Sequence, residues 1–104
     1  MEIGDMLDLR WKVLADLITD LKKRGVEIPD DVLTALRTTR SLINLYKTYR
    51  HNPDELTPQE CKVAVHRAKS DLLDIESYLI VTAANKLGER YAEEWTRKLQ
   101  ATMV

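Results

Sequence analysis

Hydrophobic residues recur at intervals of three and four along most of the chain, and polar residues occupy the positions between them. This period is that of a helix with one buried face, so the pattern predicts an all-helical fold. We expect helices at about residues 5–24, 29–50 and 58–102. The run from Tyr78 to Thr82 would also suit a β-strand, but the chain offers no second strand to pair with it.

Turn-forming residues mark the ends of these helices. Gly25 suits the position just after a helix C-terminus, and Pro29 suits the first position of the next helix. The short connection between them predicts an antiparallel hairpin. Thr57, Pro58 and Glu60 form a capping box at the start of the third helix. The length of the chain is typical of one domain, which we expect to span residues 1–104.

Gly88 leaves two architectures open. It could end the third helix, but the following Glu89-Arg90 is a poor helix start, and the apolar spacing continues through it. We therefore favour an antiparallel three-helix bundle whose long third helix is bent or broken near Gly88. The alternative is a sharp reversal at this glycine, with the tail folding back as the last helix of a four-helix bundle.

A long third helix would extend well beyond its two partners. An exposed apolar stripe of this kind usually marks a protein interface. The stripe along the overhang predicts a homodimer with two-fold symmetry. The candidate interface residues are Leu79, Leu87, Tyr91, Trp95 and Leu99.

The composition agrees with a folded protein outside the membrane. Hydrophobic residues make up 44% of the chain and charged residues 32%, which is too apolar for disorder and too charged for a membrane protein. The first residues lack the features of a signal peptide, and a single cysteine excludes an internal disulfide. By elimination, we expect a cytoplasmic location.

Candidate chemistry is sparse. Cys61 lies near a helix N-terminus, but the nearest histidine, His66, is five residues on and on another face of the helix. The loop cluster of His51, Asp54 and Glu55 matches no common ligand spacing. The acids Asp71, Asp74 and Glu76 lack the Glu-x-x-His pattern of metal-binding bundles. We expect no catalytic residue, metal or cofactor, and an enzyme is the third and weakest interpretation.

One face of the second helix carries bases and no acid. Its members are Arg37, Arg40, Lys47 and Arg50. Such a stripe can follow the phosphates of a nucleic acid or bind another phosphate ligand. Alternatively, it forms ion pairs with a neighbouring helix, in which case Arg37 would lie near Asp71 and Asp74.

Three segments resemble small archaeal helical proteins of unknown function. They are Trp11 to Leu17, Lys23 to Pro29 and Leu42 to Tyr46. The resemblance implies a helical fold and carries no activity to this chain. The leading interpretation is a protein-interaction or structural module that self-associates, and the alternative is a nucleic-acid or phosphate-ligand binder that uses the second helix.

Overall fold

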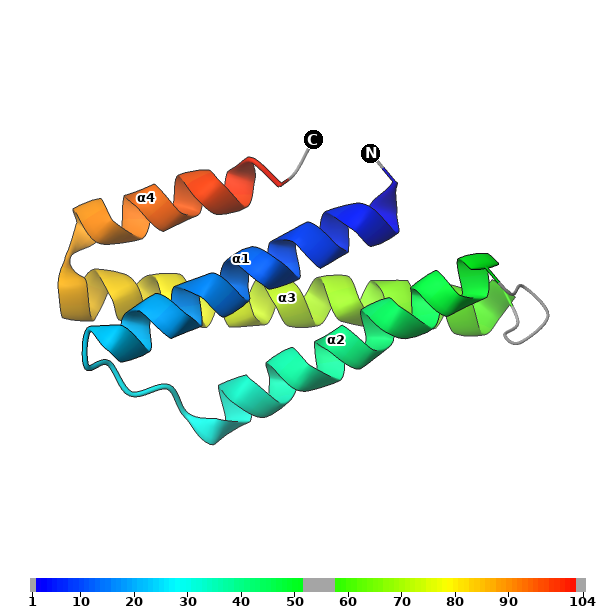
Figure 1. Ribbon diagram of the computed structural model, residues 1–104, viewed down its shortest axis with the longest axis horizontal. Coiled ribbons are helices and arrows are strands. Elements are labelled where there is room, and N and C mark those ends of the chain that lie inside the picture. Colours follow the sequence, from blue (N-terminus) through cyan, green and yellow to red (C-terminus); the bar gives the residue numbers. More distant parts are fainter. Residues whose placement is uncertain (1, 52–57, 103–104) are drawn as a thin grey trace.

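The computed structural model describes residues 2–51 and 58–102, and of residues 50, 51 and 58 it describes the backbone alone. These residues form four helices and no strand. The helices are α1 (Ile3–Lys23), α2 (Asp30–His51), α3 (Pro58–Leu87) and α4 (Glu89–Gln100). In Figure 1, α2 runs antiparallel to α1 and α3, and α4 folds back antiparallel to the end of α3. The architecture is a four-helix bundle with one short helix.

The first hairpin follows from its capping residues. The Glu2 side chain accepts a hydrogen bond from the Gly4 backbone N–H at 2.9 Å, which satisfies a donor that has no partner within α1. At the other end, Gly25 has a φ of +82°. This conformation lets the Val26 N–H reach the Leu21 carbonyl at 3.0 Å and close the helix end. The chain then turns back into α2, as the sequence predicts.

The core surrounds α3, which contacts all three other helices. The buried stripe predicted for α1 is present, and α3 contributes a matching stripe. Buried members on the two helices include Leu7, Leu14, Leu17, Ile18 and Leu21 from α1 and Ala68, Leu72, Ile75, Leu79 and Ala83 from α3. Ala68 and Ala83 are small side chains in this stripe, which leaves room for neighbouring helices. Truncating one of the buried leucines to alanine costs about 2–5 kcal/mol in cores of this kind.

Helix α1 also contacts α2 closely at two points. The Trp11 indole donates a hydrogen bond to the Leu36 carbonyl at 2.7 Å, so its polar atom is satisfied in a half-buried position. Near the start of α1, the Tyr46 ring packs against Gly4, where a Cβ atom would lie 2.8 Å from the ring. The absence of a side chain at Gly4 therefore sets how near the two helices come.

The preferred long third helix is wrong, and the four-helix alternative is confirmed. Gly88 has a φ of 98° and a ψ of 161°, a conformation that side-chain-bearing residues rarely adopt. Its N–H still completes α3 by donating to the Ala84 carbonyl at 3.0 Å, and its carbonyl accepts from the Ala92 N–H at 3.2 Å to begin α4. The poor capping residues after Gly88 are outweighed by the burial of Trp95 and Leu99 in the core.

The start of α3 agrees with its predicted position at Pro58. The capping box begins at Thr57, and that residue lies outside the described part of the chain. The neighbouring Leu56, and the candidate ligands Asp54 and Glu55, fall in the same segment. The structural description of α3 therefore begins with its first turn.

Replacing Gly88 should test the reversal. Gly88→Ala places a Cβ in open space, because no atom lies within 4 Å of that position. The cost is therefore conformational, and we expect a loss of about 1–3 kcal/mol in the free energy of unfolding. Urea denaturation followed by circular dichroism measures it. Asn85→Ala, at an exposed helical position three residues earlier, should change the stability by less than about 0.5 kcal/mol. Equal effects of the two substitutions would contradict the assigned role of Gly88.

Candidate functional site

The five residues predicted as a dimer interface lie within the chain's own bundle. Leu79 and Leu99 are fully buried and Trp95 is 8% exposed. Leu87 and Tyr91 are partly buried against the same core. The residues beyond Gly88 fold back as α4, so the geometric reason for placing an interface on this stripe is lost. Self-association itself stays a prediction, and it requires another surface.

Tyr91 instead fastens α4 to α1. Its hydroxyl donates a hydrogen bond to the Asp20 carboxylate at 2.6 Å, and Asp20 also accepts from Arg24 at 2.9 Å. The Arg24 guanidinium lies over the Tyr91 ring, 4.9 Å from its centroid. Burial, together with the hydrogen bond to Asp20, raises the pKa of Tyr91 to about 12. The phenol is therefore neutral near pH 7 and remains a donor to Asp20.

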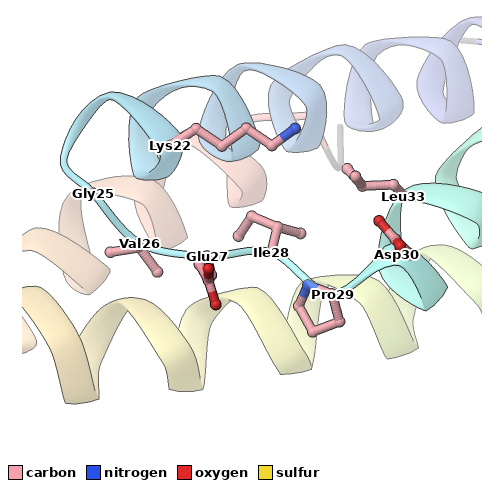
Figure 2. Close-up of a pocket in the computed structure, with 8 residues that line it drawn as sticks. All are labelled: Lys22, Gly25, Val26, Glu27, Ile28, Pro29, Asp30 and Leu33. Carbon is pink, nitrogen blue, oxygen red and sulfur yellow. The ribbon is translucent and has the colours of Figure 1, made fainter.

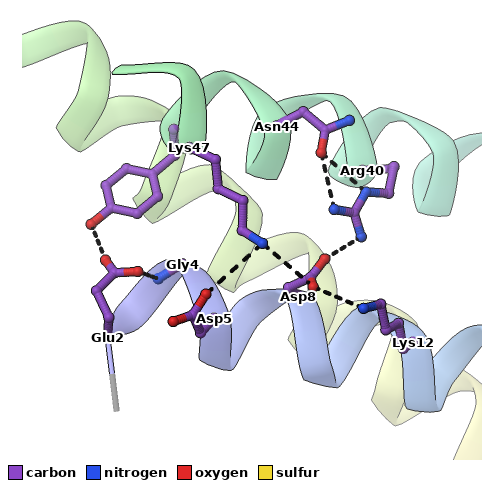
Figure 3. A network of polar contacts seen from close by, with 9 residues as sticks. Glu2, Gly4, Asp5, Asp8, Lys12, Arg40, Asn44 and Lys47 are labelled. Carbon is purple, nitrogen blue, oxygen red and sulfur yellow. Dashed lines mark hydrogen bonds and ion pairs between the residues drawn. The ribbon is translucent and has the colours of Figure 1, made fainter. Parts of the chain in front are cut away.

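The basic face of α2 is largely occupied by contacts with α1. Figure 3 shows Asp8 between two cations of α2. Its carboxylate lies 2.5 Å from Arg40 and 3.4 Å from Lys47, and Lys12 approaches it at 3.1 Å. Arg40 also donates to the Asn44 side chain. Two of the four candidate anion-binding residues are thus paired within the bundle.

The neighbouring cations act together on the pKa of Asp8. Burial by itself raises the pKa of Asp8, but the hydrogen bonds from Arg40 and Lys12 and the charges of Arg40 and Lys47 have the larger combined effect. The net result lowers the pKa to about 2. Arg40 also lies over the Trp11 ring, with 4.9 Å between its central carbon and the ring centroid. The guanidinium is therefore held by an ion pair and by an aromatic face at once.

The remaining two bases do not join this cluster. Arg37 is exposed and donates to the Thr34 hydroxyl at 3.4 Å, and the Arg50 side chain lies outside the described residues. Among the described residues, no ion pair joins Arg37 to Asp71 or Asp74, and Asp71 is instead paired with Arg67 within α3. The basic face therefore does form ion pairs with a neighbouring helix, but the acid is Asp8 of α1 and not an acid of α3. Nucleic-acid or phosphate binding stays a prediction, and the geometry does not strengthen it.

A hollow of about 730 Å³ lies along the connection between α1 and α2. Figure 2 shows its lining around residues 25–30. Lys22 lies above the connecting chain, Glu27 points below it, and Asp30 lies near its α2 end. The charges that line this exposed hollow have both signs and do not point to one common centre. The hollow therefore does not indicate a particular class of ligand.

A second opening is formed by the unequal lengths of the helices. In Figure 1, α4 runs beside only one half of α3, at the Gly88 end. Beyond the end of α4, the groove between α1 and α3 contains an apolar hollow of about 100 Å³. Its lining residues are Met6, Leu7 and Arg10 from α1, and Lys69, Leu72 and Leu73 from α3. We call this the α1–α3 groove.

The groove continues toward the start of α3. A neighbouring hollow of about 300 Å³ shares Lys69 with the first. Its other lining residues are Ile3 from α1, Tyr46 from α2, and Cys61, Lys62, Val65 and His66 from α3. Beneath the first hollow, Arg10 is only 6% exposed and forms an ion pair with Glu76. This pair joins α1 to α3 and forms one boundary of the groove. The floor is apolar and the charged side chains along both hollows are basic.

Sequence reasoning missed this groove, although one signal was present. Leu73, Ile80 and Leu87 are spaced by seven residues and so lie along one side of α3. Ile80 and Leu87 are partly buried against the core, whereas Leu73 is 55% exposed. The difference arises because α4 covers one end of this line and not the other. Without the length and direction of α4, the sequence could not show which leucine remains uncovered.

No metal-binding constellation occurs among the residues that the structure describes: no three His, Cys, Asp or Glu side chains gather closely enough to hold an ion. Cys61 is buried at the first turns of α3, where it lines the same hollow as His66. Within residues 2–51 and 58–102, no helix is both long enough and apolar enough to cross a bilayer.

A family model matches residues 7–103. Its description is the DUF2096 N-terminal four-helical bundle domain. The chain belongs to this family. The match agrees with the four helices of the structure and confirms the expected likeness to a helical family without an assigned activity, while an archaeal origin stays a prediction. No curated protein and no solved structure matches the chain.

The Asp8 cluster predicts a pH-dependent stability. The ordinary pKa of 3.8 falls to about 2 in the folded protein, so folding favours the ionised carboxylate. Its contribution is complete above about pH 4 and is lost as the pH falls toward 2. Asp8→Asn should therefore lower the free energy of unfolding by about 1–2 kcal/mol at pH 7. Urea titrations at pH 7 and at lower pH should show the difference from wild type shrinking below about pH 4.

Asp5→Asn provides the matched control. Asp5 lies on the same helix and faces the same Lys47 at 3.9 Å, but its side chain is 66% exposed. Its removal should change the stability by less than about 0.5 kcal/mol. A difference between wild type and Asp8→Asn that stays constant down to pH 2 would show that the loss comes from altered packing and not from the carboxylate charge.

Proposed function

We propose that this domain is a protein-interaction module that binds a helix of another protein in the α1–α3 groove. The observation that carries the proposal is the short α4, which has 12 residues beside the 30 of α3. At 1.5 Å per residue, roughly 27 Å of α3, or about five helical turns, extends past the length of α4. A helix laid end to end with α4 would cover this part of the bundle.

The side chains of the groove support a helical occupant. Leu73 is 55% exposed at its edge, while Leu72 is buried in its floor. Across the groove, Met6 of α1 is half-buried. An amphipathic helix that covered these residues would remove their apolar surface from water, which is the usual driving force for helix-in-groove binding.

A neutral amphipathic peptide tests this proposal. The probe is a helix of about five turns with leucine and alanine on one face and glutamine elsewhere. We expect amide shifts in NMR spectra of the labelled domain to cluster at Met6, Lys69 and Leu73. Leu73→Gln should weaken binding about tenfold, because it removes an apolar contact at the centre of the site.

Val81→Gln is the matched control for this measurement. Val81 is another exposed apolar residue of α3, at 59%, but it does not line the groove. Its replacement should leave the affinity unchanged. Shifts that map elsewhere on the bundle, or equal losses from the two substitutions, would count against the groove as the binding site.

Self-association is a second proposal, and the outer face of α3 favours it. Val63 and Val81 are 55% and 59% exposed, and the small residues Ser70 and Ser77 lie between them on the same face. Small residues allow two helices to pack closely. An antiparallel pair of α3 helices centred near residue 72 would place Val63 of one chain opposite Val81 of the other, as two-fold symmetry requires.

Sedimentation velocity tests this second proposal. The wild-type chain should form a dimer at high micromolar concentration, and Val63→Glu combined with Val81→Glu should yield a monomer because it opposes acids across the two-fold axis. Leu45→Glu, at an exposed apolar position of α2, serves as the control and should leave the dimer intact. A wild-type chain that sediments as a monomer at these concentrations would refute self-association.

A further inference from the structure

We infer that the occupant of the α1–α3 groove is an acidic amphipathic helix of a partner protein, which lies in line with α4. The inference rests on the proposed function and adds to it the chemistry of the partner. It is carried by two independent observations. The groove continues the surface of α1 and α3 on which α4 already packs. The described charged side chains that line its two hollows are all basic.

The continuity is visible on both walls of the groove. On α3, the line of Leu87 and Ile80 leads after one more heptad to Leu73. On α1, Tyr91 of α4 binds Asp20, and positions 13 and 6 follow Asp20 on the same face at heptad spacing. Met6 of α1 and Leu73 of α3 are therefore the next positions along the two helix faces beside which α4 lies. A helix placed there meets the same kind of surface that α4 meets.

Hydrogen bonds within the last turn close the C-terminal end of α4. The Ala101 N–H donates to the Arg97 carbonyl at 3.0 Å, and the Thr102 hydroxyl donates to the Leu99 carbonyl at 2.6 Å. Thr102 is 2% exposed, so the last described residue is packed into the bundle. These contacts close the last turn of α4, so the occupant of the groove would approach an ordered helix end.

The charges along the groove select an acidic partner. The charged or basic residues that line the two hollows are Arg10, Lys62, His66 and Lys69, and among the described residues neither lining contains an aspartate or glutamate. Arg10 is neutralised by Glu76. Lys62 and Lys69 are exposed, and they have no ion pair within the described residues. Carboxylates on the flanks of the bound helix would pair with these two lysines.

Another copy of this chain fits the groove less well. The apolar side chains of its α4, Trp95 and Leu99, are buried in their own bundle. The charged residues of α4 are three acids and three bases, so this helix has no net charge to match the groove. The acids are Glu89, Glu93 and Glu94, and the bases are Arg90, Arg97 and Lys98. Exchange of α4 between chains would also require both bundles to open. A separate acidic helix needs neither step.

Three peptides test the inference. They share one apolar face and carry glutamate, glutamine or lysine on its flanks. In calorimetric titrations at moderate salt, we expect the acidic peptide to bind about tenfold more tightly than the basic one, and the difference should shrink at high salt. The neutral peptide should lie between them. Equal affinities for the acidic and basic peptides would overturn the inference while leaving helix binding in the groove intact.

Charge reversal locates the effect. Lys62→Glu combined with Lys69→Glu should invert the order of the acidic and basic peptides, whereas Lys86→Glu, an exposed lysine near the far end of α3, should preserve it. Unchanged thermal unfolding midpoints show that the variants are folded. An acidic preference that survives the double reversal would place binding elsewhere. Excess unlabelled domain that shifts the Met6 and Leu73 amides would make a second copy the occupant. If no peptide shifts these amides, the proposed function itself fails.

Discussion

The backbone at Gly88 decides how much of α3 the rest of the chain can cover. Its φ of 98° lets α3 end and α4 begin with a single residue between them, so the tail returns along the bundle at once. Helix α4 has 12 residues and lies beside the 30 of α3. The end of α3 next to Gly88 shares a core with Trp95 and Leu99, and the other end carries the hollows of the α1–α3 groove. The reversal at Gly88 thus sets which end of α3 lies beside α4.

The contacts of α4 explain why its apolar stripe is not available to a partner. Tyr91 donates to Asp20 on α1, and the pKa of Asp20 is lowered by this hydrogen bond and by the contact with Arg24. Four residues on, Trp95 is buried, with the Lys98 ammonium 4.0 Å from its ring centroid. The aromatic residues that suggested an intermolecular anchor are thus anchors within the chain. Aromatic side chains at helical spacing serve either purpose equally well, and sequence alone does not distinguish them.

The periodic part of the fold could be predicted from the sequence, because the buried stripe of α1 and the caps around Gly25 depend on residues close together in the chain. The preferred prediction of a continuous third helix was wrong at Gly88. Local capping preferences oppose the reversal, but burial of the tail in the core favours it more strongly. The sequence indicated that the basic face could form ion pairs with a neighbouring helix. It did not identify Asp8 as the acid, because Asp8 approaches Arg40 only where α1 packs against α2. The groove could not be predicted, since the exposure of Leu73 depends on where another helix stops.

The distribution of paired and unpaired charges separates the two candidate surfaces. On the α2 side of α1, Arg40 and Lys47 are held by Asp8, and a carboxylate with a pKa near 2 stays ionised at any physiological pH. An incoming phosphate would have to compete with this carboxylate for both cations. Lys62 and Lys69, which line the hollows of the α1–α3 groove, have no such internal ion pair among the described residues. A ligand that offers carboxylates and apolar surface together would gain at the groove without displacing an internal partner.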